Sequence, residues 1–242
     1  MILFMMTSAI IVAAGNGIRM DDNVRKQYLL LDDRPLISHT IAVFSECNMI
    51  DEIFLVVPEE DFAFCNENIL NQQNFQKKIS LVPGGAKRQD SVYNGLLAID
   101  NIIDDSIVVI HDGVRPFIRS EQLTECITCA SDYDACIFGI PAYDTLKSVN
   151  SSGFIENTIE RNTIWLAQTP QAFKYNLIRR AHENAMHTGI NGTDDAMLVE
   201  QLGIKVRVVM GSRCNVKITT KEDLLLAGAM IKKIGKRSSF KP

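Results

Sequence analysis

The chain has 242 residues, of which 46% are hydrophobic and 22% charged, so it can bury a substantial core and has the composition of a globular protein. Its formal net charge at pH 7 is −4; removing the five Lys and Arg of residues 232–242 takes away five positive charges and leaves −9 for the rest. A body this acidic is not expected to bind nucleic acid non-specifically, so an anionic substrate would need local clusters of Arg and Lys. We expect one domain over residues 1–242, with a flexible basic tail at about 233–242.

Six cysteines are scattered along the chain without the density of a secreted disulfide scaffold, which favours a reducing, cytoplasmic location. Cys126 and Cys129 form a C-x-x-C pair, but no second pair of Cys or His lies near enough in the sequence to complete a zinc site, so a core role is favoured. No apolar stretch approaches the roughly 20 residues that a membrane-spanning helix needs. We therefore expect no membrane partner.

The first predicted element is a strand that leads into an anion-binding loop. Residues 9–13 are all apolar, as in a strand buried on both faces of a parallel sheet. Small residues follow, and they allow backbone N–H groups to approach a phosphate closely. Cationic side chains then complete the pattern. The loop residues concerned are Ala14, Gly15, Gly17, Arg19 and Lys26.

Three interpretations of this loop compete. A dinucleotide-binding loop would read G-x-G-x-x-G, but Met20 occupies the position of the third glycine. A P-loop would need a second glycine followed by Lys and Ser or Thr, which the stretch after Gly15 lacks. A tight turn with solvated cations remains the alternative to an anion site.

Apolar runs and helical periodicities alternate along the rest of the chain. Short apolar runs predict strands, and apolar residues at helical spacing between them predict helices. The predicted strands are residues 53–57, 79–82, 107–110, 135–140 and 205–210, and the predicted helices include 36–47, 59–70, 92–99, 174–186, 194–202 and one after Thr220. This alternation predicts an α/β fold whose mostly parallel sheet is covered by helices on both faces.

Residues 142–165 depart from this pattern. Their polar and apolar residues alternate with a period of about two around Ser151, Ser152 and Gly153, as in a β-hairpin. We therefore expect a protruding hairpin, called the arm below, rather than an element of the core.

Three loops that follow predicted strands carry glycines and charged side chains. Ligands of open parallel sheets bind beyond the carboxyl ends of the strands, so these loops should meet in one cleft, as in a nucleoside-triphosphate site. Asp112 directly follows a buried strand, where it could hold Mg²⁺ against phosphate oxygens; an N-cap or an ion pair with Arg115 is the alternative. His111 is expected to be a packed structural residue. The loops are residues 15–26, 84–91 and 111–116.

Seven ordered motifs resemble those of the 2-C-methyl-D-erythritol 4-phosphate cytidylyltransferase family, across nearly the whole chain. They are VAAGNGIRM with KQY, GGAKRQDSV, HDGVRP, DTLK, ERNTIWLAQTPQAF, TDDA and NVKITTKEDL. The resemblance implies a Rossmann-like nucleotidyltransferase fold, a homodimer formed through the arm, and Mg²⁺ as cofactor. It also implies CTP and methylerythritol phosphate as substrates, CDP-methylerythritol and pyrophosphate as products, and a step of the non-mevalonate isoprenoid pathway.

The resemblance further implies roles for individual residues at the matching positions of this chain. The residues that would contact CTP are Ala13, Ala14, Gly15, Gly85, Arg88 and Ser91. The residues that would act on the phosphates are Arg19, Lys26 and Lys217, with Asp112 as the metal ligand. The residues that would bind methylerythritol phosphate are Arg115, Thr145, Arg161 and Thr169.

The chain departs from the family pattern at a few positions. Arg25 stands where proline commonly precedes the catalytic Lys, so we expect a less rigid loop with an extra cation. Val12, Gly113 and Cys214 also replace residues that are frequent in the family, but none of these changes removes a group that the chemistry needs.

Other functions remain as alternatives. An alditol-phosphate cytidylyltransferase, such as the ribitol 5-phosphate enzyme, shares the GxGxRM, HDxVRP and QTPQ elements but lacks the equivalents of Trp165 and of residues 193–195. A nicotinamide-dependent reductase would need the missing third glycine and a Tyr/Lys proton relay. A non-catalytic nucleotide-binding protein is disfavoured because Arg19, Lys26 and Asp112 are all present.

Overall fold

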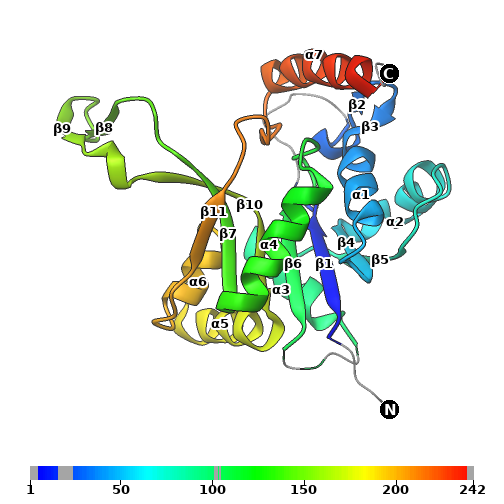
Figure 1. Cartoon of the computed structure of the whole chain (residues 1–242), viewed down its shortest axis with the longest axis horizontal. Coiled ribbons are helices and arrows are strands. Elements are labelled where there is room, and N and C mark those ends of the chain that lie inside the picture. Colours follow the sequence, from blue (N-terminus) through cyan, green and yellow to red (C-terminus); the bar gives the residue numbers. More distant parts are fainter. Residues whose placement is uncertain (1–4, 16–23, 101–102, 104, 239–242) are drawn as a thin grey trace.

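The computed structural model describes residues 5–15, 24–100, 103 and 105–238, with side chains as far as residue 233. Its centre is a seven-stranded sheet of order β11-β7-β10-β6-β1-β4-β5 (Figure 1). Neighbouring strands are parallel except β10, which is antiparallel to both β6 and β7. The strands are β1 (Thr7–Val12), β4 (Glu52–Val57), β5 (Lys78–Pro83), β6 (Ile107–Asp112), β7 (Ala135–Pro141), β10 (Trp165–Lys174) and β11 (Arg207–Met210). The predicted α/β fold with a mostly parallel sheet is confirmed.

Helices cover both faces of the sheet because its central strands are apolar on both sides. On β1, Ala9 and Ile11 pack in one buried cluster with α1 and α4, whereas Ile10 packs in another with α3, α5 and α6. A third, smaller cluster lies under α7. The helices are α1 (Leu36–Glu46), α3 (Arg88–Leu97), α4 (Ser120–Tyr133), α5 (Tyr175–Thr188), α6 (Asp195–Glu200) and α7 (Lys221–Ser238).

The segment predicted as one helix over residues 59–70 is helical throughout but not uniform. It consists of a 3-10 turn η3 (Glu59–Asp61), the short α2 (Phe62–Cys65) and a π-helical turn η4 (Asn66–Leu70). A 3-10 turn η2 (Lys26–Tyr28) and a small hairpin of β2 (Leu30–Leu31) and β3 (Arg34–Pro35) precede α1.

Strand β10 is the main element that the sequence patterns did not predict. Its middle carries Gln168, Thr169, Pro170 and Gln171, which do not read as a buried strand because proline cannot donate to a ladder hydrogen bond. The sheet accommodates them through a register shift between Gln168 and Gln171 in the pairing with β7. These polar residues thereby come to the carboxyl end of β6.

The predicted arm is a two-stranded hairpin that extends far from the sheet (Figure 1). It consists of β8 (Leu146–Val149) and β9 (Ile155–Ile159), followed by the 3-10 turn η5 (Arg161–Thr163). Trp165 already belongs to β10, where it pairs with Pro141 of β7. The arm is therefore an insertion between two adjacent strands of the central sheet.

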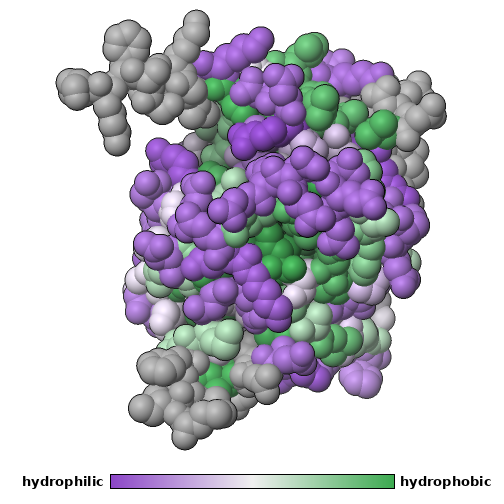
Figure 2. All heavy atoms as spheres, turned by 90° about the vertical axis from the view of Figure 1, so that its right-hand side faces the viewer, coloured by the Kyte–Doolittle hydropathy of each residue, from purple (hydrophilic) through white to green (hydrophobic). Residues whose placement is uncertain are grey.

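The C-x-x-C pair lies in the hydrophobic core, as expected: both Cys126 and Cys129 are buried on α4. Seen from the side of β5, the surface is largely hydrophilic, with apolar side chains gathered near its middle and along one edge (Figure 2). In the described part of the chain, no helix combines the length and the apolar character that crossing a membrane requires.

Candidate active site

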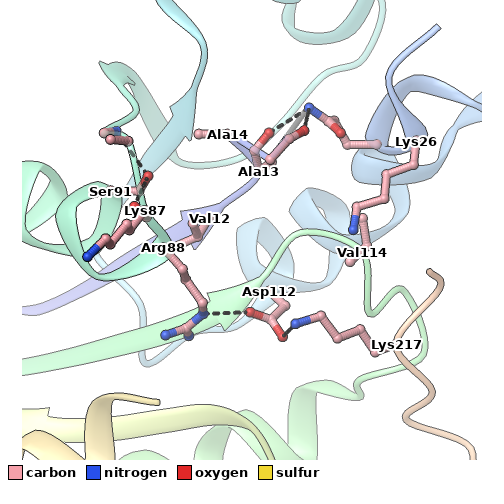
Figure 3. A pocket seen from close by; sticks show the side chains of 14 residues that line it. Val12, Ala13, Ala14, Lys26, Lys87, Arg88, Ser91, Asp112, Val114 and Lys217 are labelled. Atoms are coloured by element: carbon pink, nitrogen blue, oxygen red, sulfur yellow. Dashed lines mark hydrogen bonds and ion pairs between the residues drawn. The ribbon is translucent and has the colours of Figure 1, made fainter. Parts of the chain in front are cut away.

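A cavity of about 320 Å³ lies beyond the carboxyl ends of β1 and β6 (Figure 3); it is called the nucleotide cavity below, after the ligand that the sequence motifs predict for it. The loops after β1, β5 and β6 all contribute to it, as expected for parallel strands that end at the same edge. Among its lining residues are Ala13, Ala14, Gly15, Lys26, Gly85, Arg88, Ser91, Asp112 and Lys217. Arg19, the remaining expected phosphate-binding residue, lies outside the described residues.

The loop between β5 and α3 reaches the cavity because its glycines allow very close packing. A Cβ on Gly84 would lie 2.2 Å from Cβ of Ala14, and one on Gly85 would lie 2.3 Å from Cβ of Asp90. The N–H of Gly85 donates to Ser91 Oγ at 3.0 Å. The tight turn places the N-terminus of α3 at the cavity, where its unpaired N–H groups favour an anion.

Gln27 holds the far side of the cavity. It is 1% exposed, and its Nε2 donates to the carbonyl oxygens of Ala13 at 2.7 Å and Gly15 at 3.4 Å. Gln27 thereby ties the turn that carries Lys26 to the end of β1, and the Lys26 side chain lines the cavity (Figure 3). Sequence reasoning placed Gln27 in a motif but gave it no role.

Arg25 does not add a cation to the cavity, contrary to our expectation. Its guanidinium forms ion pairs with Glu60 at 2.7 Å and with Asp61 at 2.7 Å, and it does not line the cavity. The carboxylates of Glu60 and Asp61 raise the pKa of Arg25, with the hydrogen bond to Glu60 as the largest cause. The turn before Lys26 is thus held by charge where the family commonly uses proline.

Asp112 is the centre of a buried charge cluster. Its Oδ1 accepts from Arg88 Nε at 3.1 Å, and its Oδ2 accepts from Lys217 Nζ at 2.9 Å and Arg115 Nε at 3.3 Å. Burial alone would raise the pKa of Asp112, but the charges of Arg88, Lys217 and Arg115 outweigh it and hold that pKa well below its ordinary value. The ion pair with Arg115, which was the alternative to metal binding, is therefore present, alongside two others.

A second cavity of about 260 Å³ adjoins the first; it is called the acceptor cavity below, after the sugar phosphate that the sequence motifs predict for it. Arg88, Asp112 and Lys217 line both, so these side chains form the wall between them. Arg115 and Thr169, two of the expected sugar-phosphate ligands, line the acceptor cavity together with Thr193.

The other two expected sugar-phosphate ligands lie on the arm. Thr145 and Arg161 line neither cavity, and Arg161 Nη1 donates to the carbonyl oxygen of Tyr143 at the base of the same arm. Within one chain, the structure therefore brings Arg115 and Thr169 together but not Thr145 and Arg161.

Buried amides position the acceptor cavity, and the sequence reasoning did not single them out. Asn215 is fully buried. Its side-chain Nδ2 donates to the backbone carbonyl of Thr169 at 2.8 Å, and the backbone carbonyl of Asn215 accepts from Arg115 Nη1 at 2.8 Å. Gln168 Nε2 donates to Ser212 O at 2.9 Å. Gln168 lies among the mostly apolar residues 164–173, where a buried amide needs a hydrogen-bond partner, and this was a signal in the sequence; the mixed surroundings of Asn215 gave none.

The donor set at Asp112 fits Mg²⁺ only in a limited way. In the residues that the structure describes, no group of three or more His, Cys, Asp or Glu could hold a metal ion. Mg²⁺ commonly binds through one or two carboxylates and completes its shell with waters and substrate phosphates, so Asp112 could serve as its protein ligand only where substrate phosphates complete that shell. Lys217, 40% exposed in its side chain, is the most accessible of the cations that bind Asp112.

His111 is a structural residue, as expected. It is fully buried next to Phe44, and its Nε2 lies 3.2 Å from the carbonyl oxygen of Arg115. Burial lowers its pKa to about 4, so the ring is neutral around pH 7. It supports the turn after β6 and does not line either cavity.

Comparison with known proteins agrees with this geometry. Residues 7–233 match the model of the family described as 2-C-methyl-D-erythritol 4-phosphate cytidylyltransferase. A protein of that name from Geotalea uraniireducens is 47% identical over 230 residues, which cover 95% of this chain and 98% of the relative. One from Clostridioides difficile is 49% identical over 222 residues, which cover 92% of each.

Solved structures give the same result for the fold. The 4-diphosphocytidyl-2C-methyl-D-erythritol synthase of Anaerococcus prevotii superimposes with a TM-score of 0.82 at 34% identity, covering 94% of this chain and 96% of that one. The 2-C-methyl-D-erythritol 4-phosphate cytidylyltransferase of Thermus thermophilus gives 0.77 at 29% identity, covering 94% and 100%. The sequence motifs, the two cavities and these similarities agree, and the chain belongs to the 2-C-methyl-D-erythritol 4-phosphate cytidylyltransferase family.

Proposed function

We propose that this chain transfers the cytidylyl group of CTP to 2-C-methyl-D-erythritol 4-phosphate, giving CDP-methylerythritol and pyrophosphate, in the non-mevalonate synthesis of isoprenoid precursors. Membership of the family supports this reaction. The observation that carries it is the pair of adjoining cavities, one lined by a glycine loop and Lys26, the other by Arg115 and Thr169. If each cavity takes one substrate, their shared wall would bring the two anionic substrates side by side.

The reaction needs neutralisation and alignment more than a base. A phosphate oxygen of methylerythritol phosphate attacks the α-phosphorus of CTP in line; that P–O bond forms as the bond to the pyrophosphate oxygen breaks. Lys26 and Lys217 bind the negative charge that develops on the transferred phosphoryl group and on pyrophosphate, and Arg115 holds the attacking phosphate. No covalent nucleophile is required.

Mg²⁺ is part of the proposal, with Asp112 as its protein ligand. When bound, it would supply further positive charge to the phosphates of CTP. Asp112 is ionised around neutral pH because three cations lower its pKa, so it is ready to bind a cation once phosphates draw Lys217 away. The partial exposure of Lys217 supports this exchange.

CTP is the expected nucleotide from membership of the family, and its cytosine is expected to lie near Gly85 and Ser91. Both residues lie in the tight turn before and within α3, where a larger side chain at Gly85 would collide with Asp90. If this turn limits the room for the base, the smaller pyrimidine ring should be preferred over a purine.

A homodimer joined through the arm is a further part of the proposal. Three apolar side chains of the arm are more than half exposed: Val149 at 53%, Phe154 at 71% and Ile155 at 63%. A two-stranded hairpin is marginal by itself, so a partner surface that covers these side chains would stabilise it. In such a dimer, Thr145 and Arg161 would serve the partner's acceptor cavity.

The cellular setting is proposed as the cytoplasm, with residues 1–242 acting as one domain. All six cysteines are unpaired, which supports a reducing compartment. The acidic body supports the expectation that nucleic acid is not a partner.

Pyrophosphate release from purified protein tests the function directly. The protein should release pyrophosphate from CTP only when methylerythritol phosphate is present, and much more slowly with UTP, ATP or GTP. Ribitol 5-phosphate should be a poor acceptor; the names of the relatives favour methylerythritol phosphate over it. Equal rates with both sugar phosphates would support the alditol-phosphate alternative, and equal rates with ATP would contradict the nucleotide assignment.

Titration with Mg²⁺ tests the metal assignment. Asp112→Asn should weaken the Mg²⁺ dependence of the rate because the ion loses its one expected carboxylate ligand. Circular dichroism controls for the fold, since removing the charge of Asp112 also takes away the carboxylate with which Arg115 and Lys217 pair. A folded variant with the wild-type Mg²⁺ titration would refute Asp112 as the ligand.

A further inference from the structure

Behind the wall between the two cavities lies a second carboxylate, that of Asp195, which lines neither cavity. Asp195 is the first residue of α6 and is 1% exposed. Its Oδ2 accepts from Arg88 Nη1 at 2.7 Å, a shorter contact than the 3.1 Å between Arg88 Nε and Asp112. Arg88 is thus held between one carboxylate at the site and one behind it.

Three elements hold Asp195 in place. His182 of α5, fully buried, places Nε2 3.2 Å from Asp195 Oδ1, and this nitrogen must be the donor because the carboxylate can only accept. The ring of Tyr93 from α3 stacks on His182, with centroids 6.1 Å apart. Gln171 of β10 accepts from the N–H of Asp195 at 3.1 Å.

The surroundings of Asp195 also keep its carboxylate negatively charged. Burial alone would raise the pKa of Asp195, but the charge of Arg88 and the hydrogen bond from His182 outweigh it and lower that pKa. The carboxylate therefore stays ionised behind Arg88. Removing its charge would leave Asp112 as the only carboxylate that the structure shows on Arg88.

We propose that Asp195, held by His182, is a positioning residue that divides Arg88 between two carboxylates and so fixes the wall between the nucleotide and acceptor cavities. The inference rests on the proposed function, because this wall matters for transfer only if each cavity holds a substrate. In-line transfer requires both reactants to be aligned, and a misplacement of about 1 Å can cost about 10² in rate. Asp195 should therefore affect turnover more than the binding of either substrate alone.

Asp195→Asn tests whether Asp195 positions Arg88, since the amide keeps the size of the side chain and removes its charge. We expect kcat to fall about tenfold or more, while the Kd of CTP, measured calorimetrically without the second substrate, changes less than about threefold. The matched control is Tyr175→Phe, which removes a buried hydroxyl on α5 that donates to Leu96 O, away from Arg88. It should lower the melting temperature without lowering kcat.

Two results with Asp195→Asn would overturn the proposal. One is an unchanged kcat. The other is an equal loss of CTP affinity and turnover, which would make Asp195 a residue for nucleotide binding or folding.

If Asp195→Asn does not fold, a pair of variants at His182 tests the positioning role instead. His182→Gln keeps a nitrogen donor able to reach Asp195, whereas His182→Leu removes it. We expect kcat near wild type for Gln and several-fold lower for Leu, at similar CTP affinity. Equal turnover in the two variants would contradict a positioning role.

An NMR measurement separates this inference from the proposed function. The side-chain Nη–H signals of Arg88, assigned through their loss in Arg88→Lys, should exchange slowly with water in the wild type, where Nη1 donates to Asp195, and faster in Asp195→Asn or His182→Leu. If wild-type protein shows no cytidylyl transfer, the proposed function fails, yet these signals still report on the hold on Arg88. Unchanged exchange in the variants would overturn the positioning role even in an active enzyme.

Discussion

The cleft and the arm contribute residues to one expected site, yet they hold their side chains in opposite ways. In the cleft, Asp112, Arg88 and Arg115 each contact two or more partners within the chain. On the arm, every residue of β9 is exposed, and Arg161 contacts only the base of its own hairpin in the described contacts. One chain is therefore enough to shape the cleft, whereas the side chains of β9 stay exposed in the part of the chain that the structure describes.

The base of the arm lies between the cleft, whose side chains are held by several contacts, and the exposed hairpin. The guanidinium of Arg213 lies 3.6 Å from the ring centroid of Tyr143, and Arg161 donates to the Tyr143 carbonyl. Beyond this point the arm is held by its own ladder between β8 and β9. Cleft variants should thus act in every chain alone, while arm variants should act through the proposed dimer.

Lys26→Ala should have the largest effect and tests the cleft side of this comparison. The positive charge of Lys26 matters most when charge develops in the transition state, so kcat should fall by ~10² or more while KM changes much less. Steady-state kinetics over a range of enzyme concentrations measures both. The loss should be the same at every concentration; an unchanged kcat would exclude Lys26 from the chemistry.

Mixing two inactive variants tests the arm side. If Arg161 serves the partner's cavity, a heterodimer of Lys26→Ala and Arg161→Ala chains has one site with both lesions and one intact site. Equal mixing makes half of the dimers mixed, so activity should recover to roughly a quarter of wild type after reversible dissociation. If activity does not recover after verified subunit exchange, Arg161 does not serve the partner's site, and the arm acts within its own chain as the cleft does.

His111, buried behind the cleft, should also make the free energy of unfolding depend on pH. The pKa of His111 is about 4 when folded and 6.5 in its ordinary state, so the unfolded chain binds a proton more readily. Its contribution to stability is present above pH 6.5 and is lost as pH falls toward 4, by at most ~1.4 kcal/mol per pH unit.

His111→Gln isolates this contribution because Gln keeps a nitrogen donor but does not titrate in this range. Between pH 7 and pH 4.5, wild type should lose about 2 kcal/mol more unfolding free energy than the variant. Urea unfolding at both pH values measures the difference. Parallel losses in the two proteins would show that His111 is not the titrating group.

Arg25→Ala should have the smallest effect, because the ion pairs of Arg25 are partly exposed and lie outside the cavity. We expect the KM for CTP to rise about two- to fivefold through a looser turn at Lys26, with kcat nearly unchanged. Glu60→Gln removes only the more exposed of the two ion pairs and should have less effect. A loss of kcat as large as that of Lys26→Ala would show that Arg25 acts in the cleft itself.

Much of the fold and the nucleotide cavity could be predicted from sequence patterns. Strands buried on both faces require continuous apolar runs, and the runs of β1, β4, β6 and β7 are of this kind. Since parallel strands end at one edge, the residues that follow them, such as Gly15 and Asp112, had to lie close together. Local pattern and sheet geometry were sufficient for this part of the site.

The partners of the charged side chains could not be predicted in the same way. Arg88 pairs with Asp195, 107 residues away, only because β10 inserts antiparallel beside β6 and brings α6 behind the cleft. Pro170 and its polar neighbours concealed that strand, and Arg25 likewise meets Glu60 only through packing of η3 against the turn. Burial patterns depend on each residue's own polarity, whereas ion pairs depend on which distant segments the tertiary fold brings within 3 to 4 Å of each other.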